Sequence, residues 1–318
     1  MIKSNTAERV ADVNDAAGGG AGPNTSFVGG MRTLAMALGA TALTAVTAPA
    51  QGGLISGTFA DHQTFGVNYL VGGSAVTATG GATVGVRAYS SLFAGGQQNT
   101  TGTLISDRYV LIGYHQVSQI LNSNPTFEIS TGPNAQTNRG TVMRVSRLIT
   151  FPNGSQLNPS LPDYALLELT SAIAGVVPVT IGSAVAGQTA SSAGFGSWAN
   201  PGGTFVRTFD VLGGVGPIRA SNLNGYSSQY YFQTDFLPGI LMNWRGGNGD
   251  SGSPAFGQNG ELLGIGIAGT IGSGIAGQTT FLRLDNPSVY SDLARYIPSP
   301  GSAMLLGLAG LAAARRRR

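Results

Sequence analysis

A short serine-containing segment, Gly-Asp-Ser-Gly-Ser-Pro (249–254), has the residue types that nucleophilic catalysis uses. A serine hydroxyl is a weak nucleophile until a neighbouring base takes its proton, so Ser251 needs a histidine and a carboxylate from elsewhere in the chain. The chain contains two histidines, His62 and His115. Because it also contains 50 glycines, the alternative is that Ser251 lies in an ordinary glycine-rich turn.

His115 follows an apolar run, Val110 to Ile112, that is typical of a strand. Asp163 begins a second such segment, Asp-Tyr-Ala-Leu-Leu-Glu-Leu. The separations along the chain are 163 − 115 = 48 and 251 − 163 = 88 residues. A carboxylate that orients a histidine, beside a histidine that deprotonates a serine, would perform acyl transfer. A histidine at a strand end can also be a packed residue, so the histidine alone does not establish this chemistry.

The segment 102–116, GTLISDRYVLIGYHQ, resembles the histidine motif of the trypsin-like serine peptidases, G-[ST]-L-I-x-x-x-[WY]-V-L-T-A-A-H-C. It departs from that motif beside the histidine, where Tyr114 replaces an alanine and Gln116 replaces a cysteine. DYALLEL (163–169) resembles the aspartate motif of the family, and GDSG resembles its serine motif. The order His, Asp, Ser is also that of chymotrypsin, and it differs from the orders in subtilisin and the α/β-hydrolases. The resemblance covers about residues 80–297.

The resemblance implies a role for each of these residues. Ser251 would attack the scissile carbonyl, His115 would carry the proton to the leaving amine, and Asp163 would orient the imidazole. The backbone N–H groups of Gly249 and Ser251 would form the oxyanion hole. Glu168 lies on the opposite face of its strand from its leucine neighbours and is expected to be solvated.

The resemblance also assigns positions around the site. Arg245 and Gly269 would line the primary specificity pocket, where an arginine would disfavour basic side chains, although Arg245 can equally point to solvent. Ile267 stands where the family has a serine that supports the aspartate. Asp250 would be buried, and in the family it pairs with a new N-terminus. The segment Leu70-Val71-Gly72-Gly73 resembles the one that forms this N-terminus in the family. Tyr69 precedes it where an arginine or lysine would be needed, so we expect activity without tryptic activation.

The predicted fold class is all-β. The resemblance implies two six-stranded antiparallel barrels, at 51–175 and 176–297, with the site between them and a short helix at the end. Asn259-Gly260 predicts a hairpin in the second barrel. The segment 286–297 is predicted to be the helix, with Asn286 as N-cap and Pro287 in its first turn.

Composition excludes several classes of function. Charged residues are 10% of the chain, and residues 51–300 contain ten arginines, no lysine and eleven acidic residues, a net charge of −1. No basic patch indicates a nucleic-acid partner. Cysteine is absent, so the chain has neither a disulfide framework nor a thiolate metal site. No cofactor is implied, and a structural Ca²⁺ ion stays an open alternative.

The N-terminal region 1–50 is interpreted as an extension followed by a secretory signal peptide. Residues 31–50 contain a basic residue, an apolar run and a small-residue cleavage site ending at Ala50. A buried helix is the alternative interpretation. Residues 1–30 are polar and Gly-rich, so either translation starts at Met31 or the extension is disordered.

The C-terminal region 298–318 contains Pro-Ser-Pro, an apolar run and four arginines. It resembles the PEP-CTERM sorting signal of certain Gram-negative and planctomycete bacteria, with serine in place of glutamate. In those proteins a membrane protease, exosortase, is thought to process the tag. The expected partners are therefore the export machinery, an exosortase-like enzyme and, through this segment, the membrane. The expected location is the cell envelope, the cell surface or the medium of a Gram-negative-type bacterium; a short membrane anchor is the alternative.

The sequence as a whole predicts an exported serine endopeptidase, monomeric, that acts on protein or peptide substrates. A different class of function stays open, that of an inactive trypsin-like homologue used as a binding module in the envelope or matrix. The unusual residues around His115 and at Ile267 favour that alternative, whereas the retention of all three candidate catalytic residues opposes it. A purely structural envelope protein would leave the segment 249–254 unexplained.

Overall fold

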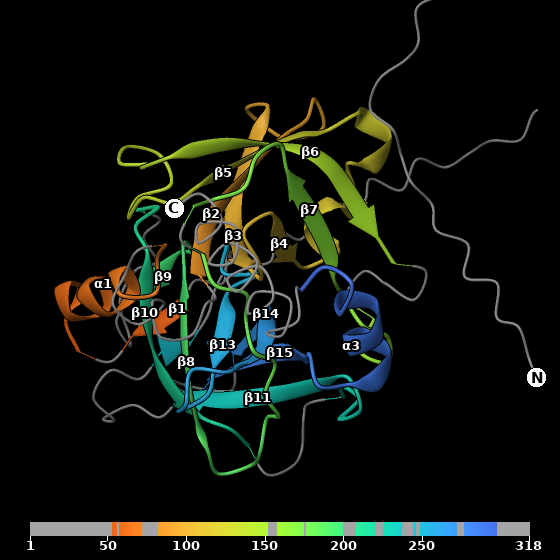
Figure 1. The fold of residues 1–318 in the computed structure, drawn as a ribbon. Coiled ribbons are helices and arrows are strands. Elements are labelled where there is room, and N and C mark those ends of the chain that lie inside the picture. The colour runs from red at the N-terminus through yellow and green to blue at the C-terminus, as the bar shows by residue number, and fades with distance from the viewer. Residues whose placement is uncertain are drawn as a thin grey trace, which may run out of the picture.

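The structure is a computed structural model that describes residues 53–55, 57–71, 82–151, 158–174, 176–199, 208–219, 225–236, 244–245, 249–271 and 277–297. A closed barrel lies beside a curled six-stranded sheet, and each has its own apolar interior (Figure 1). The predicted signal peptide and sorting tag lie outside the described residues. Within the described part of the chain, no helix has both the length and the apolar character that crossing a membrane requires.

The closed barrel is formed by six antiparallel strands near the N-terminal end of the fold. In spatial order they are β2 (Ala82–Tyr89), β3 (Gln97–Leu104), β4 (Tyr109–Ile112), β7 (Ala165–Leu169), β6 (Val142–Thr150) and β5 (Thr126–Ser130). Alternate residues face inward, so Val110, Ile112 and Leu167 are fully buried in one cluster. The apolar runs that predicted strands therefore fill this interior.

The second unit is a six-stranded sheet in the order β10 (Leu212–Pro217), β8 (Thr189–Gly194), β13 (Pro254–Phe256), β14 (Leu262–Ile271), β15 (Gly277–Arg283) and β11 (Tyr231–Phe236). An isolated bridge between Ile218 and Thr234 joins the two ends of this sheet. The fold class predicted from the sequence is confirmed, with one refinement: the second unit is a curled half-barrel. The hairpin predicted at Asn259-Gly260 is present between β13 and β14.

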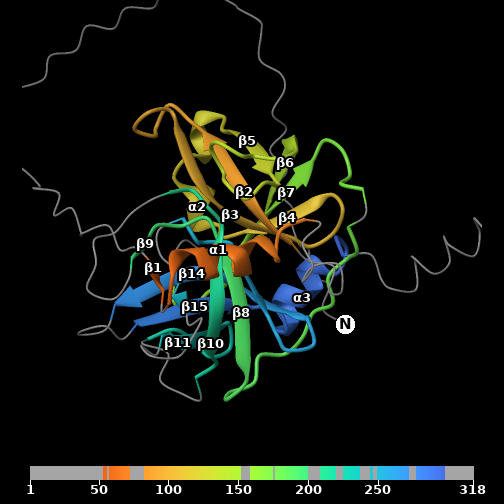
Figure 2. The same cartoon turned by 90° about the vertical axis from the view of Figure 1, so that its left-hand side faces the viewer.

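The N-terminal residues of the described chain pack on this second unit. Strand β1 (Gly53–Ile55) lies between β12 (Trp244–Arg245) and β9 (Trp198–Ala199). Helix α1 (Phe59–Val67) follows and lies across β8 and β10 (Figure 2). Its N-cap is Thr58, whose hydroxyl accepts a hydrogen bond from the N–H of Asp61. The sequence did not predict this helix.

The described chain contains three further helical segments, all short. Helix α2 (His115–Ser118) begins at the candidate catalytic histidine and is followed by a 3₁₀ turn, η1 (Leu121–Ser123). Helix α3 (Pro287–Leu293) begins as predicted, with the Asn286 side chain accepting from the N–H groups of Ser288 and Val289. It ends four residues earlier than predicted, and a turn replaces its last part.

We expect the substitution Asn286→Ala to lower the free energy of unfolding by about 1 kcal/mol, because two N–H groups at the start of α3 lose their acceptor. Thermal denaturation would measure the change. Ser291→Ala, at an exposed position in the same helix, is the matched control and should change stability by less than about 0.5 kcal/mol. Equal effects of the two substitutions would contradict the capping role.

Candidate active site

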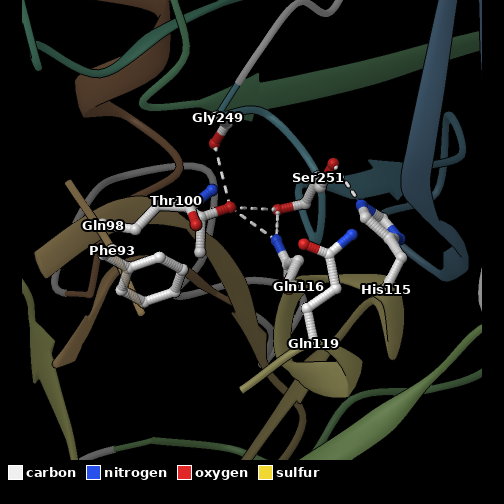
Figure 3. A pocket seen from close by; sticks show the side chains of 8 residues that line it. All are labelled: Phe93, Gln98, Thr100, His115, Gln116, Gln119, Gly249 and Ser251. Carbon is white, nitrogen blue, oxygen red and sulfur yellow. Dashed lines mark hydrogen bonds between the residues drawn. The ribbon is translucent and has the colours of Figure 1, made fainter. Parts of the chain in front are cut away.

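The three predicted residues lie in one chain of hydrogen bonds. His115 Nε2 is 2.8 Å from Ser251 Oγ, and His115 Nδ1 is 2.7 Å from Asp163 Oδ2. Figure 3 shows His115 and Ser251 facing one another beside a pocket. The Asp163 carboxylate is fully buried, whereas 15% of the His115 side chain is exposed. A buried carboxylate that orients a partly exposed histidine is the arrangement that acyl transfer requires.

The pairing of two barrel strands brings the histidine and the aspartate together. Ile112 of β4 is the register partner of Ala165 of β7. His115 lies just beyond the end of β4, and Asp163 lies just before the start of β7. Antiparallel pairing places these two positions at the same edge of the barrel. Ser251 reaches them from the second unit, on the loop before β13.

Asp163 contacts His115 through both carboxylate oxygens. The backbone N–H of His115 donates to Oδ1 at 2.9 Å, while the imidazole Nδ1 lies against Oδ2. This arrangement holds the imidazole so that Nδ1 carries its proton and Nε2 is free to accept one from serine. Burial raises the pKa of Tyr231, and the negative charge of Asp163 raises it further. Tyr231 therefore stays neutral beside the carboxylate.

Ile267 is buried and only 2% exposed. Its side chain belongs to the apolar cluster that contains Tyr231 and Ile265. An isoleucine offers no hydroxyl to a carboxylate. Among the described residues, the hydrogen bonds to Asp163 come from the backbone N–H and the imidazole of His115.

The candidate oxyanion donors, the N–H groups of Gly249 and Ser251, lie in the loop that carries the nucleophile. Gly249 has a φ of +97°, a conformation that favours glycine, and it precedes Ser251 by two residues. Asp250, between them, is 6% exposed, and its Oδ1 accepts a hydrogen bond from the N–H of Gly196 at 2.8 Å. The buried carboxylate thus ties the nucleophile loop to the segment that follows β8.

The predicted specificity residues are placed only in part. Arg245 lies in strand β12, where its backbone pairs with Leu54 of β1. The side chain of Arg245 lies outside the described structure. Gly269 lies in β14 opposite Thr279. The primary specificity pocket therefore stays a prediction. Glu168, which was expected to be solvated, is half-buried and forms an ion pair with Arg147 at 2.9 Å.

A pocket of about 380 Å³ opens beside the candidate triad. Apart from His115, none of the residues that line the pocket has a side chain that carries a charge. The lining residues are Phe93, Gln98, Thr100, His115, Gln116, Gln119, Gly249 and Ser251. Sequence reasoning did not find the glutamines, the phenylalanine or Thr100. The one available signal was Gln116, which stands where the histidine motif has a cysteine.

The second histidine does not take part in this site. His62 is fully buried in α1, and its Nδ1 lies 2.6 Å from the carbonyl oxygen of Gly213. No group of three or more potential metal-ligating His, Cys, Asp or Glu side chains occurs among the described residues.

Gly252 allows the nucleophile loop to lie against β3. Its φ is +85°, and a Cβ at this position would lie 2.2 Å from the carbonyl oxygen of Thr101. We expect Gly252→Ala to lower the free energy of unfolding by more than about 2 kcal/mol, because it adds a clash to the backbone strain. Chemical denaturation would measure the change.

Gly187→Ala is a matched control for this prediction. Gly187 has nearly the same φ, +84°, and open space around it. An alanine there would have the same unfavourable backbone conformation but no steric clash of its Cβ. The loss at Gly187 should be about 1–2 kcal/mol. Equal losses at the two positions would show that the contact between the loop and β3 is not tight.

The fold and the arrangement of these side chains define a chymotrypsin-like protein with a candidate Ser-His-Asp site. A sequence model of the family named Trypsin matches residues 70–297, which is most of the chain, and the chain therefore belongs to the trypsin family. No curated protein matches the sequence.

Two solved structures illustrate the likeness of the fold. The scabies mite inactivated protease paralogue S-I1 is 16% identical, with a TM-score of 0.50, over 73% of this chain and 96% of that chain. A structure of HL collagenase is also 16% identical, with a TM-score of 0.53, over 68% of this chain and 94% of that chain. At these identities the likeness concerns the fold alone.

Proposed function

We propose that this protein is a serine endopeptidase that hydrolyses peptide bonds through an acyl-enzyme. The observation that carries the proposal is the continuous hydrogen-bonded series from Asp163 through His115 to Ser251. Membership of the trypsin family supports protein substrates as the general class. The uncharged pocket beside Ser251 gives room for a substrate residue next to the nucleophile.

In the proposed mechanism, Ser251 Oγ attacks the carbonyl carbon of the scissile bond while its proton passes to His115 Nε2. Asp163 stabilises the imidazolium that forms, because its carboxylate already lies against Nδ1. The N–H groups of Gly249 and Ser251 bind the oxyanion. Nε2 then protonates the leaving amine, and a water molecule activated by the same nitrogen hydrolyses the ester on Ser251.

A second candidate function is that of an inactive homologue that binds proteins. Ile267 in the apolar core and the altered residues around His115 are the observations that favour it. One of the proteins with a similar fold is itself described as an inactivated protease paralogue. The intact contacts among the three candidate catalytic residues favour the peptidase.

Incubation of the full-length protein with unfolded proteins and with a mixed peptide library would distinguish the two functions. The peptidase predicts new amino termini in the wild-type reaction and none with Ser251→Ala. Binding of the substrates without any cleavage, by a folded wild-type protein, would instead support the binding module.

We also propose that the protein is exported to the envelope, the cell surface or the medium of a Gram-negative-type bacterium. An exosortase-like enzyme processes its C-terminal tag. The mature protein acts as a monomer. The pattern of segment 31–50 supports export, and the pattern of segment 298–318 supports processing of the tag. Mass spectrometry of the protein from its natural host would locate both mature ends. A mature start at residue 70 would contradict the further proposal that no tryptic activation is needed.

A further inference from the structure

We propose that Gln116 and three threonines of β3, Thr100, Thr101 and Thr103, act as positioning residues that hold the nucleophile loop for catalysis. We call these four residues the loop clamp. The inference rests on the proposed peptidase function, because it assigns the clamp to that reaction. The clamp comes from the closed barrel, whereas the loop that it holds belongs to the second unit.

The clamp contacts backbone carbonyl groups of the nucleophile loop. The Thr101 hydroxyl donates to the carbonyl oxygen of Gly249 at 2.7 Å, and the Thr103 hydroxyl donates to that of Gly252 at 2.7 Å. The Gln116 amide donates to the carbonyl oxygen of Ser251, which Thr100 Oγ also approaches at 3.2 Å (Figure 3).

These contacts leave little freedom to the peptide units around Ser251. The remaining carbonyl group, that of Asp250, accepts from the N–H of Ser253 at 2.9 Å. Every carbonyl from 249 to 252 therefore has a donor. Because a peptide unit is planar, fixing a carbonyl also fixes the direction of the N–H in the same unit. The clamp thereby determines the backbone on both sides of the unit that carries the Ser251 N–H, a proposed oxyanion donor.

The direction of donation is defined for Thr101. Its hydroxyl oxygen accepts from the backbone N–H of Phe195 at 2.9 Å, so its single proton is available for the carbonyl of Gly249. Thr101 is fully buried, and removal of its hydroxyl would leave both backbone groups without this partner. A serine at this position would keep a hydroxyl that can make both contacts. A valine has no group that can make either of them.

The direction is also defined for Gln116. Its Oε1 accepts from the N–H of Gly113 at 3.0 Å, so Nε2 faces Thr100 and the carbonyl of Ser251. Gln116 follows His115 directly in the sequence. One side chain therefore links the backbone that carries the proposed base to the backbone that carries the proposed nucleophile. In a chain without cysteine, this link is made by hydrogen bonds.

Paired substitutions in the full-length protein test the clamp. Thr101→Val keeps the shape of the side chain and removes the hydroxyl, whereas Thr101→Ser keeps the hydroxyl. Gln116→Met keeps the length and removes the amide. Thr83→Val is the matched control, because Thr83 is equally buried and its hydroxyl contacts the carbonyl of Ala193 in β8 at 3.4 Å rather than a carbonyl of the nucleophile loop.

A misplaced catalytic group costs on the order of 10²-fold in rate. We therefore expect Thr101→Val and Gln116→Met to lower kcat by about 10- to 100-fold. For Thr101→Val, whose site does not line the pocket, KM should change less than about threefold. Thr101→Ser should retain most of kcat. Thr83→Val should lose stability and leave kcat within about twofold. A kcat for Thr101→Val equal to that of Thr83→Val, with both proteins folded at the assay temperature, would overturn the proposal.

Hydrogen exchange of the loop amides supplies a test that does not depend on activity. The N–H groups of Gly252 and Ser253 are hydrogen-bonded within the loop region, to Gly266 and Asp250. Their exchange should be faster in Thr101→Val than in Thr101→Ser or Thr83→Val. If the wild-type protein hydrolyses nothing, the proposed function fails, and equal exchange rates in these variants would then overturn the clamp separately.

Discussion

Ser251→Ala and His115→Ala should each lower kcat by on the order of 10⁶-fold, the size that is found when either of these members of a catalytic triad is removed. The physical reason is the single hydrogen bond of 2.8 Å between Ser251 Oγ and His115 Nε2. Without the histidine the hydroxyl keeps its proton, and without the serine the histidine has no nucleophile to activate. Each residue therefore contributes to acyl transfer only when the other is present.

The double variant makes this prediction more specific. The two residues act as one unit. The kcat of the double variant Ser251→Ala/His115→Ala should therefore be no more than about tenfold below that of either single variant. The three variants and the wild-type protein would be compared in single-turnover assays with the same peptide. Losses that multiply, or a His115→Ala variant with most of its activity, would show that His115 is not the base for Ser251.

Asp163→Asn should lower kcat by about 10⁴-fold while the fold is retained. The structure explains the loss through the orientation of the new amide. The backbone N–H of His115 requires an acceptor, so the asparagine oxygen takes the place of Oδ1. Its NH₂ group then faces His115 Nδ1, which must accept rather than donate. The imidazole proton moves to Nε2, which can no longer take the proton of Ser251.

Glu168→Gln is the control for this substitution. Glu168 lies on strand β7, only a few residues after Asp163, and its carboxylate contacts Arg147 rather than the histidine. It tests the loss of a carboxylate charge near the site, and kcat should change by less than about threefold. Steady-state kinetics and thermal denaturation of both variants would separate catalysis from stability. Similar kcat values for the two variants would contradict the role of Asp163.

Motifs in the sequence predicted the parts of the fold that depend on local pattern. The apolar runs at β4 and β7, the hairpin at Asn259-Gly260 and the cap at Asn286 all follow from spacing and turn chemistry. The same motifs named the three side chains that the structure brings into contact. Each of these residue patterns occurs in few structural settings, so a short segment is enough to predict the local structure.

Other features depend on contacts between distant segments and could not be predicted in this way. Helix α1 has no strong apolar stripe; its formation depends on packing, as at Gly66, where a Cβ would lie 2.9 Å from the carbonyl oxygen of Val211. The threonines of β3 are ordinary strand residues in the sequence. Their partners lie about 150 residues away, on the loop around Ser251, and only the three-dimensional fold brings the two together.

The most direct test of the account is covalent labelling of the full-length protein with a fluorophosphonate, followed by mapping of the adduct by mass spectrometry. An activated serine reacts with this probe and an ordinary serine does not. We expect one adduct, on Ser251, absent from Ser251→Ala and greatly reduced in His115→Ala. A folded wild-type protein without an adduct on Ser251, or with an adduct that persists in Ser251→Ala, would contradict the assignment of Ser251 as the nucleophile.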